Sequence, residues 1–243
     1  QVIDLATLSP AQGFIIQGAA FVDRAGSGVG SADVNGDGYA DMIVGARYGD
    51  SGGDYSGEVY VIFGAASGIG SEVDGRQVVD LATLSADRGF LIAGVADFDL
   101  TGGSVSSAGD VNGDGYEDLI IGADSADGPA EGSGIGYVVF GSGTGFGVDV
   151  GGRQVIDLAT LDATQGFVVW GAAGGDNAGR SVSSAGDVNG DGYDDIIVGA
   201  PLSDPAGGNA GNAYVIFGKA SGFGVDVDGR QVIELSSLSP EEG

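Results

Sequence analysis

The 243-residue sequence contains no cysteine and no histidine, and only one of its eight basic residues is a lysine. The lack of both residue types excludes disulfide cross-links, Ser-His-Asp and Cys-His catalytic groups, and histidine-ligated zinc. No apolar run approaches the roughly 20 residues that a membrane-spanning helix needs. We therefore expect no membrane insertion, and we expect packing and bound ions to stabilise the fold.

Acidic residues dominate the charge of the chain. Asp and Glu number 35, and the formal net charge is -27 at pH 7. Such a surface repels nucleic acids and anionic membranes and attracts cations. No nucleic-acid partner is expected, and the composition favours an extracellular protein, either secreted or at the cell surface.

A nine-residue acidic loop occurs three times, beginning at Asp33, Asp110 and Asp187 and therefore 77 residues apart. Oxygen-bearing side chains occupy positions 1, 3, 5 and 9 of each loop, and Gly at position 6 permits a sharp turn. Carboxylate, amide and backbone carbonyl oxygens are the ligands that calcium prefers. With the carbonyl oxygen of the Tyr at position 7, the expected ligands of three calcium ions are Asp33, Asn35, Asp37, Tyr39 and Asp41 in the first loop, Asp110, Asn112, Asp114, Tyr116 and Asp118 in the second, and Asp187, Asn189, Asp191, Tyr193 and Asp195 in the third.

The alternative interpretation of each loop is a plain hairpin turn, because Asn-Gly and Asp-Gly are common turn dipeptides. A turn does not need acids at positions 1, 5 and 9, however. Three clustered carboxylates also repel one another unless a cation lies between them. Because the whole pattern occurs three times in register, we favour calcium binding.

The repeat extends well beyond the acidic loop. The segment Gln-Val-Ile-Asp-Leu begins at Gln1 and returns in closely similar form at Gln77, Gln154 and Gln231. Self-similarity on this scale indicates an array of one supersecondary unit, each copy burying its apolar face against the next. We predict a single repeat domain over residues 1–243, with repeats at about 1–76, 77–153 and 154–230 and the start of a fourth at 231–243.

Each repeat contains four short apolar runs separated by turns rich in Gly and Asp. In the third repeat these runs are Phe167–Trp170, Ser181–Ala185, Ile196–Ala200 and Tyr214–Phe217. Their length and their content of β-branched and aromatic residues are typical of strands. Three of the four runs do not alternate, which indicates strands that are covered on both faces. The sequence thus predicts an all-β fold in which blades of four antiparallel strands stack as in a β-propeller.

The run from Ser181 to Pro201 resembles the FG-GAP repeat of integrin α-subunit propellers and related bacterial proteins. The resemblance covers essentially the whole chain. It implies that the acidic loop joins the first and second strands of a blade and binds calcium through the residues named above. The Phe-Gly pair of the family is replaced by Ala25-Gly26, Thr101-Gly102 and Ala178-Gly179. These departures bear on an integrin-like binding role more than on the calcium ligands, all of which are present.

Three repeats are too few for a closed propeller, which has four to eight blades. We expect either a homodimer in which two chains close a six-bladed ring, or further blades in a longer chain. An open arc of three blades is the least favoured arrangement, because it would expose apolar faces and strand edges.

The first functional hypothesis is a noncatalytic adhesion, ligand-binding or scaffold module. Its protein or glycan ligand is expected on the face opposite the calcium loops, where the connecting loops differ most between repeats. The candidate contacts there are Arg24, Tyr48, Phe98 and Arg180. The alternatives are a self-assembling repeat that forms a dimer or filament, and a polysaccharide-active enzyme that uses paired carboxylates. No separate group of catalytic side chains stands out, so we expect no enzymatic activity.

Overall fold

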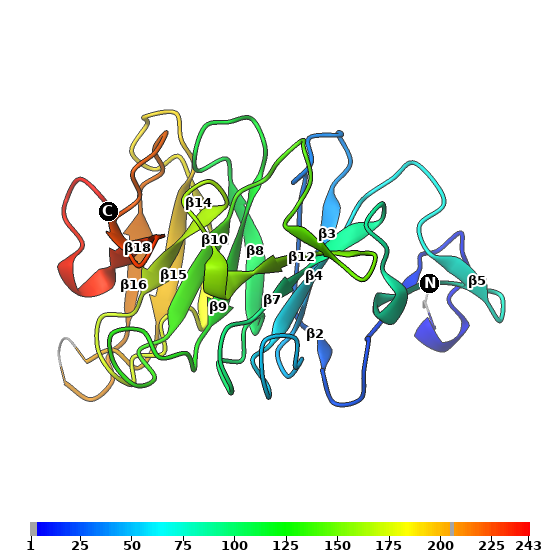
Figure 1. The fold of residues 1–243 in the computed structure, drawn as a ribbon, viewed down its shortest axis with the longest axis horizontal. Helices are drawn as coiled ribbons and strands as arrows, with labels where there is room; N and C mark the ends of the chain where they lie inside the picture. Colours follow the sequence, from blue (N-terminus) through cyan, green and yellow to red (C-terminus); the bar gives the residue numbers. More distant parts are fainter. Residues whose placement is uncertain (1–3, 205–206) are drawn as a thin grey trace.

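A computed structural model describes residues 4–204 and 207–243, and their fold is all-β (Figure 1). The only helices in this part of the chain are single 3₁₀ turns: η1 (Leu5–Thr7), η2 (Leu81–Thr83), η3 (Leu158–Thr160) and η4 (Leu235–Ser237). None of them is long and apolar enough to span a bilayer. The first copy of the repeated Gln-Val-Ile segment, at Gln1, lies outside the described residues.

Two complete blades confirm the predicted four-stranded unit. The first blade consists of β2 (Ala25–Ala32), β3 (Asp41–Ala46), β4 (Glu58–Ile62) and β7 (Gly89–Ala93), and the second of β8 (Ser104–Gly109), β9 (Asp118–Ala123), β10 (Ile135–Val139) and β13 (Gly166–Trp170). Neighbouring strands in each blade are antiparallel and paired in chain order. The strands therefore follow the apolar runs of the sequence closely.

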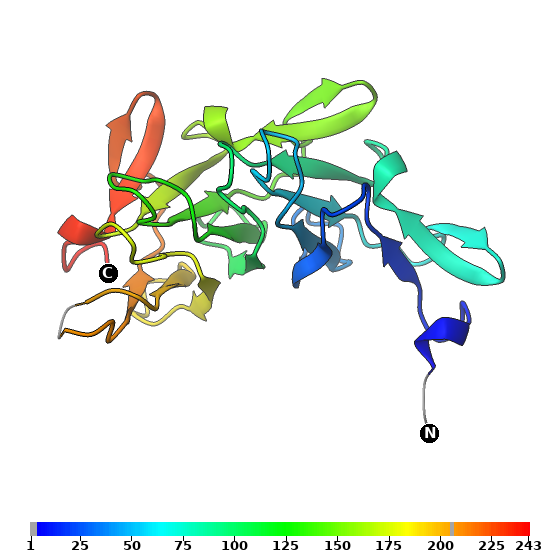
Figure 2. The same ribbon diagram turned by 90° about the horizontal axis from the view of Figure 1, so that it is seen from below.

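The described residues at the two ends of the array form incomplete sheets. The third blade contains three antiparallel strands, β14 (Ser181–Gly186), β15 (Asp195–Ala200) and β16 (Asn212–Ile216). The first strand of the chain, β1 (Ile15–Gln17), has the position of an outer strand and pairs in parallel with only one neighbour. These two sheets lie at opposite ends of a row of side-by-side blades that forms an open arc (Figure 2).

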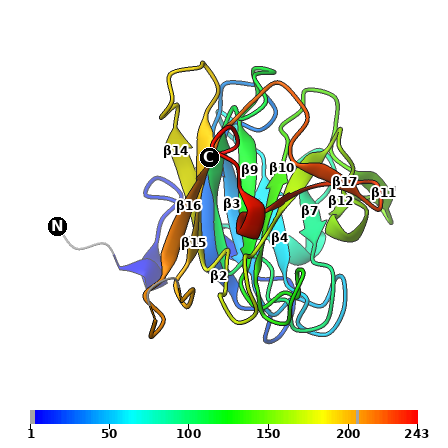
Figure 3. The same ribbon diagram turned by 90° about the vertical axis from the view of Figure 1, so that its left-hand side faces the viewer.

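Each repeat contains one short hairpin, which pairs with the outer strand that precedes the blade. These three hairpins were not predicted from the sequence. They are β5–β6 (Ser71–Val73 and Arg76–Asp80), β11–β12 (Val148–Val150 and Arg153–Asp157) and β17–β18 (Val225–Val227 and Arg230–Glu234). The second strand of each hairpin pairs in parallel with the outer strand of the preceding blade. In the view along the row, the hairpin strands β11, β12 and β17 lie on one side of the molecule, and the inner strand β14 lies on the opposite side (Figure 3).

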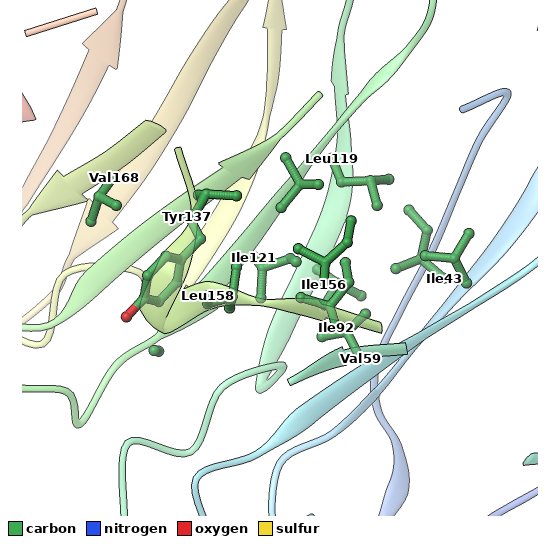
Figure 4. Packing of buried hydrophobic residues seen from close by; sticks show 14 of the residues in the cluster. Ile43, Val59, Ile92, Leu119, Ile121, Tyr137, Ile156, Leu158 and Val168 are labelled. Atoms are coloured by element: carbon green, nitrogen blue, oxygen red, sulfur yellow. The ribbon is translucent and has the colours of Figure 1, made fainter. Parts of the chain in front are cut away.

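The hydrophobic core lies between the blades rather than at a central axis. One cluster combines Ile43, Val59 and Ile92 of the first blade with Ile121 and Tyr137 of the second (Figure 4). A second cluster joins the second and third blades in the same way. Each blade is thus covered by apolar side chains of its neighbour, which explains why its strands lack polar alternation.

Candidate metal centre

The three acidic loops occupy equivalent places in the fold, between the first and second strands of each blade. They connect β2 to β3, β8 to β9, and β14 to β15, as the sequence predicts. Each loop begins where the inner strand ends, and its ninth residue is the first residue of the next strand. The paired strands therefore fix both ends of every loop.

The side chains at positions 1, 3 and 5 fold inward over the backbone of their own loop. The Asp33 carboxylate accepts hydrogen bonds from the N–H groups of Asp37 and Gly38, at 3.1 and 2.9 Å. The Asn35 side-chain oxygen accepts from the Asp37 N–H at 2.9 Å, and the Asp37 carboxylate accepts from the Tyr39 N–H at 2.8 Å. The same pattern recurs in the other two loops. The structure therefore brings three of the predicted ligands of each loop together around one short backbone segment.

Glycine is required at position 6 because the backbone there is left-handed. The φ angles are +86° at Gly38, +92° at Gly115 and +95° at Gly192. Residues with a side chain rarely adopt this conformation. The sequence-based role of Gly at position 6 is thereby confirmed.

The ninth residue of each loop is fully buried. Asp41, Asp118 and Asp195 have no solvent exposure. The Asp41 carboxylate accepts hydrogen bonds from the N–H groups of Val34, at 3.0 Å, and Gly64, at 2.8 Å, and Asp118 and Asp195 have equivalent partners. Each of these carboxylates thus joins the start of its loop to the segment that follows the third strand.

Burial dominates the protonation of Asp41 and Asp118. Desolvation raises the pKa of Asp41 to about 6 and that of Asp118 to about 8, against the smaller opposing effect of the backbone hydrogen bonds. The acids at loop positions 1 and 5 raise both pKa values further. In the described part of the chain the two ion pairs are Arg47–Asp124 and Arg180–Asp124, so no basic side chain compensates the ninth residues.

These residues suit a hard cation in their chemistry. Every candidate ligand is an oxygen, and a carboxylate that accepts two hydrogen bonds keeps further lone pairs for an ion. A buried carboxylate is costly unless a charge compensates it, which a divalent cation at the loop would do. Among the described residues, however, no three acidic side chains are close enough to form a metal-binding cluster. The ligand assignment at positions 1, 3, 5, 7 and 9 therefore stays a prediction.

Aromatic and basic side chains gather on loops that connect other strands. The Arg24 guanidinium lies 4.6 Å from the centre of the Tyr48 ring, and the Arg47 guanidinium lies 5.5 Å from it. The Tyr55 ring continues this group, with its centroid 5.5 Å from that of Tyr48 and 5.7 Å from that of Phe98. Because Phe98 is 58% exposed, the group presents aromatic surface to solvent.

The fourth predicted contact, Arg180, lies at the next junction between blades. Its guanidinium forms an ion pair with Asp124 at 2.5 Å, and the other oxygen of Asp124 lies 3.7 Å from Arg47. This ion pair raises the pKa of Arg180. The structure thus places Arg24, Tyr48 and Phe98 in one group and links Arg180 to it only through Asp124 and Arg47.

Comparison with known proteins identifies the repeat. The sequence pattern described as the FG-GAP repeat matches residues 25–62, 101–139 and 178–216. The chain contains three FG-GAP repeats. Each match begins at the inner strand of a blade or three residues before it and ends with the third strand, so every FG-GAP repeat includes one complete acidic loop.

Several relatives of this FG-GAP chain are integrin alpha subunits. The chain is 29% identical over 177 residues to integrin alpha-PS5 of Drosophila melanogaster, covering 72% of this chain and 15% of that protein. It is 32% identical over 180 residues to mouse integrin alpha-IIb, covering 72% and 14%. It is 31% identical over 209 residues to bovine phosphatidylinositol-glycan-specific phospholipase D, covering 82% and 21%. The chain therefore matches only a small part of each relative.

Several residues of these FG-GAP repeats were not predicted from the sequence. Glu117 and Asp194, at position 8 of the second and third loops, contact the preceding loop, whereas the first loop has Ala40 at this position. An acid at position 8 was the available signal. Tyr55 was missed as well, because a single exposed Tyr in a Gly- and Ser-rich turn carries no distinguishing pattern.

Proposed function

We propose that this chain is a calcium-binding module of an extracellular protein and that it binds a ligand rather than catalysing a reaction. The observation that carries the proposal is the buried carboxylate at position 9 of three equivalent loops, which no basic side chain of the described residues compensates. Each loop would hold one calcium ion through the side-chain oxygens of positions 1, 3, 5 and 9 and the carbonyl of position 7.

The calcium ions would stabilise the loops rather than take part in a reaction. A bound cation would neutralise the acids that gather in each loop and would hold the two inner strands of a blade in register. Ions that bind only the folded state stabilise it by mass action, by about 2.7 kcal/mol per site at 100-fold excess over the dissociation constant. Extracellular modules often bind calcium with dissociation constants of about 10⁻⁴ to 10⁻³ M.

The ligand face would be the end of the blades opposite the acidic loops. Arg24, Tyr48 and Phe98 offer cationic and aromatic surface there, and Arg180 lies at the next junction. Several integrin alpha subunits are among the relatives, which supports a protein ligand. A glycan is the alternative ligand, because exposed aromatic rings also stack on sugar rings. Binding of either ligand should be lost in Arg24→Ala and Tyr48→Ala and retained in Leu5→Ala, a control that changes an exposed residue of the 3₁₀ turn η1.

Two relatives are named as a phospholipase D, which makes catalysis the second candidate function. The match covers only 19% to 21% of those proteins, so their activity belongs to this chain only as a hypothesis. A polysaccharide-active enzyme was the catalytic alternative from the sequence. Incubation with phosphatidylinositol-glycan and with a polysaccharide panel distinguishes the functions: binding without turnover supports the proposal, and turnover contradicts it.

Assembly of the blades is a separate proposal. Two chains could close a six-bladed homodimer, or further blades of a longer chain could complete the ring. β1 and β16 each have an edge without a strand partner in the described residues, which either arrangement could cover. Sedimentation equilibrium in millimolar calcium and in chelator distinguishes a calcium-dependent dimer from a monomer, and continued growth in mass would indicate a filament.

Thermal unfolding tests the calcium proposal directly. The melting temperature should rise with calcium and fall in excess chelator. Asp114→Ala should remove one ion and lower the melting temperature in calcium, whereas Glu72→Ala, which changes an exposed acid on β5, should match the parent protein. A melting curve that is unchanged by chelator contradicts calcium binding.

A further inference from the structure

The first and second acidic loops are each held by residues of the following blade. The Glu117 carboxylate, at position 8 of the second loop, accepts a hydrogen bond at 3.0 Å from the N–H of Asp33, which begins the first loop. The Glu117 N–H donates to the Asp33 carbonyl oxygen at 3.3 Å. Ser107 of the inner strand β8 donates to the same Glu117 carboxylate oxygen at 3.3 Å. The acid at position 8 is therefore directed at the neighbouring loop, not at the ligands of its own loop.

Two further contacts hold the first loop from the same side. The Tyr116 ring lies against Gly36, where an added Cβ would be only 2.7 Å from the ring. The Ser142 N–H, from the segment that follows β10, donates to the Val34 carbonyl oxygen at 2.8 Å. Residues of the second repeat thus contact positions 1, 2 and 4 of the first loop.

The same set of contacts recurs between the second and third loops. The Asp194 carboxylate accepts from the Asp110 N–H at 2.9 Å, and its own N–H donates to the Asp110 carbonyl oxygen at 3.1 Å. The Tyr193 ring lies against Gly113, and the Lys219 N–H donates to the Val111 carbonyl oxygen at 2.9 Å. Because the contact recurs with Asp in place of Glu, we regard it as a specific contact between loops.

These contacts act on the first ligand position of the receiving loop. Asp33 and Asp110 each supply a proposed ligand carboxylate, and the position-8 acid fixes the backbone from which that carboxylate projects. Groups that orient a metal ligand without touching the ion change metal affinity by about 10- to 100-fold. Tyr116 and Glu117 in turn belong to the second loop, so their positions depend on whether that loop is ordered.

We infer that neighbouring calcium loops are coupled, with Glu117 acting as a positioning residue for the site at residues 33–41 and Asp194 for the site at residues 110–118. The inference rests on the proposed calcium binding. Occupation of one loop orders the contacts that support the loop before it, and linkage makes the effect reciprocal. Calcium then binds the three loops with positive cooperativity.

The test uses proteins with defined sets of calcium loops. Asp191→Ala leaves the first and second loops, and Asp37→Ala with Asp191→Ala leaves only the second. Adding Glu117→Ala should weaken calcium binding at the first loop about 10- to 100-fold in the first protein and leave binding in the second protein within twofold, as measured by isothermal titration calorimetry. Loss of affinity at the second loop instead would show that Glu117 serves its own site and would overturn the inference.

Matched variants separate positioning from charge. Glu117→Gln keeps an oxygen acceptor for the Asp33 N–H and should restore most of the affinity, whereas an unrestored affinity would assign the effect to the charge and contradict positioning. Glu72→Ala removes an exposed acid and should change nothing.

A measurement in the absence of calcium tests the same contact if the variants that lack calcium ligands fold poorly. In chelator, Glu117→Ala in the otherwise unchanged chain should speed hydrogen exchange at the Asp33 amide and not at the Asp187 amide. Equal exchange in both proteins would overturn the inference. If the parent protein binds no calcium at all, the proposed function fails; if it binds three ions and Glu117→Ala has no effect, only the coupling fails.

Discussion

The Phe146 ring stacks on the Phe90 ring across the junction of two blades, with ring centroids 4.1 Å apart and planes 9° from parallel. Phe90 belongs to the outer strand of the first blade, and Phe146 precedes the β11–β12 hairpin of the second repeat. Phe223 and Phe167 repeat the arrangement at the next junction, at 4.2 Å and 5°. The hairpins and these stacked pairs together attach each blade to its predecessor.

We predict that Phe146→Ala lowers the free energy of unfolding by about 3–5 kcal/mol, the cost of removing a buried Phe side chain. Phe146 is 6% exposed and Phe21 is 96% exposed, so Phe21→Ala is the matched control and should change stability little. Urea denaturation measures both. Equal stability of the two variants would show that the stacked pair does not hold the blades together.

Gly122 in β9 lies where the next blade approaches most closely. A Cβ at this position would overlap the Gly179 carbonyl oxygen, which is backbone and cannot move aside. Gly122→Ala should therefore destabilise the junction strongly, by more than the roughly 1–3 kcal/mol of ordinary overpacking. The control is Gly136→Ala in the adjacent strand β10, where the nearest atom is 3.6 Å from an added Cβ and the change should be tolerated. Similar melting temperatures for the two variants would contradict this packing.

Glu58 gives a prediction for pH dependence. It is buried in β4, where its carboxylate accepts hydrogen bonds from Tyr60 and Ser51, and desolvation raises its pKa. Because the folded state holds the proton more tightly than the unfolded state, this contribution to stability is complete at low pH. It is lost as the pH rises above the ordinary value of about 4.3 and through the raised pKa of the folded state.

Glu58→Gln should remove this loss, because the amide stays neutral. The variant should gain stability over the parent protein as the pH rises from 4 to 7, by about 1.4 kcal/mol for each unit of the shift. Urea denaturation at fixed calcium concentration measures the difference, and Glu72→Gln, at an exposed site, should show none. A difference that is constant with pH, or that shrinks, would contradict the raised pKa.

Much of the fold could be predicted from the sequence because its apolar runs are strand-length and repeat in register. Phe167–Trp170 and Ile196–Ala200 lie in β13 and β15, and the acidic loops join the first two strands of each blade. The hairpins were missed because a strand such as Arg76–Asp80 is polar at both ends. Its pairing with the preceding blade depends on contacts that a single repeat does not reveal.

The candidate site was predictable in composition but not in its connections. Residue spacing indicated the oxygens at positions 1, 3 and 5, which accept hydrogen bonds from the backbone of their own loop, and their role as ligands stays a prediction. It could not indicate that Asp41 accepts hydrogen bonds from the backbone N–H groups of Val34 and Gly64. Nor could it indicate that Glu117 accepts a hydrogen bond from the preceding loop. Both sets of hydrogen bonds depend on how strands and blades pack together, which the local sequence does not predict.

Calcium stoichiometry tests the central claim most directly. Equilibrium dialysis of the metal-stripped chain against a calcium series spanning about 10⁻⁵ to 10⁻² M covers the affinities of extracellular modules. The proposal predicts three ions per chain, falling to two in Asp114→Ala. No saturable binding in that range, or an undiminished stoichiometry in the variant, would contradict the assignment of the acidic loops as calcium sites.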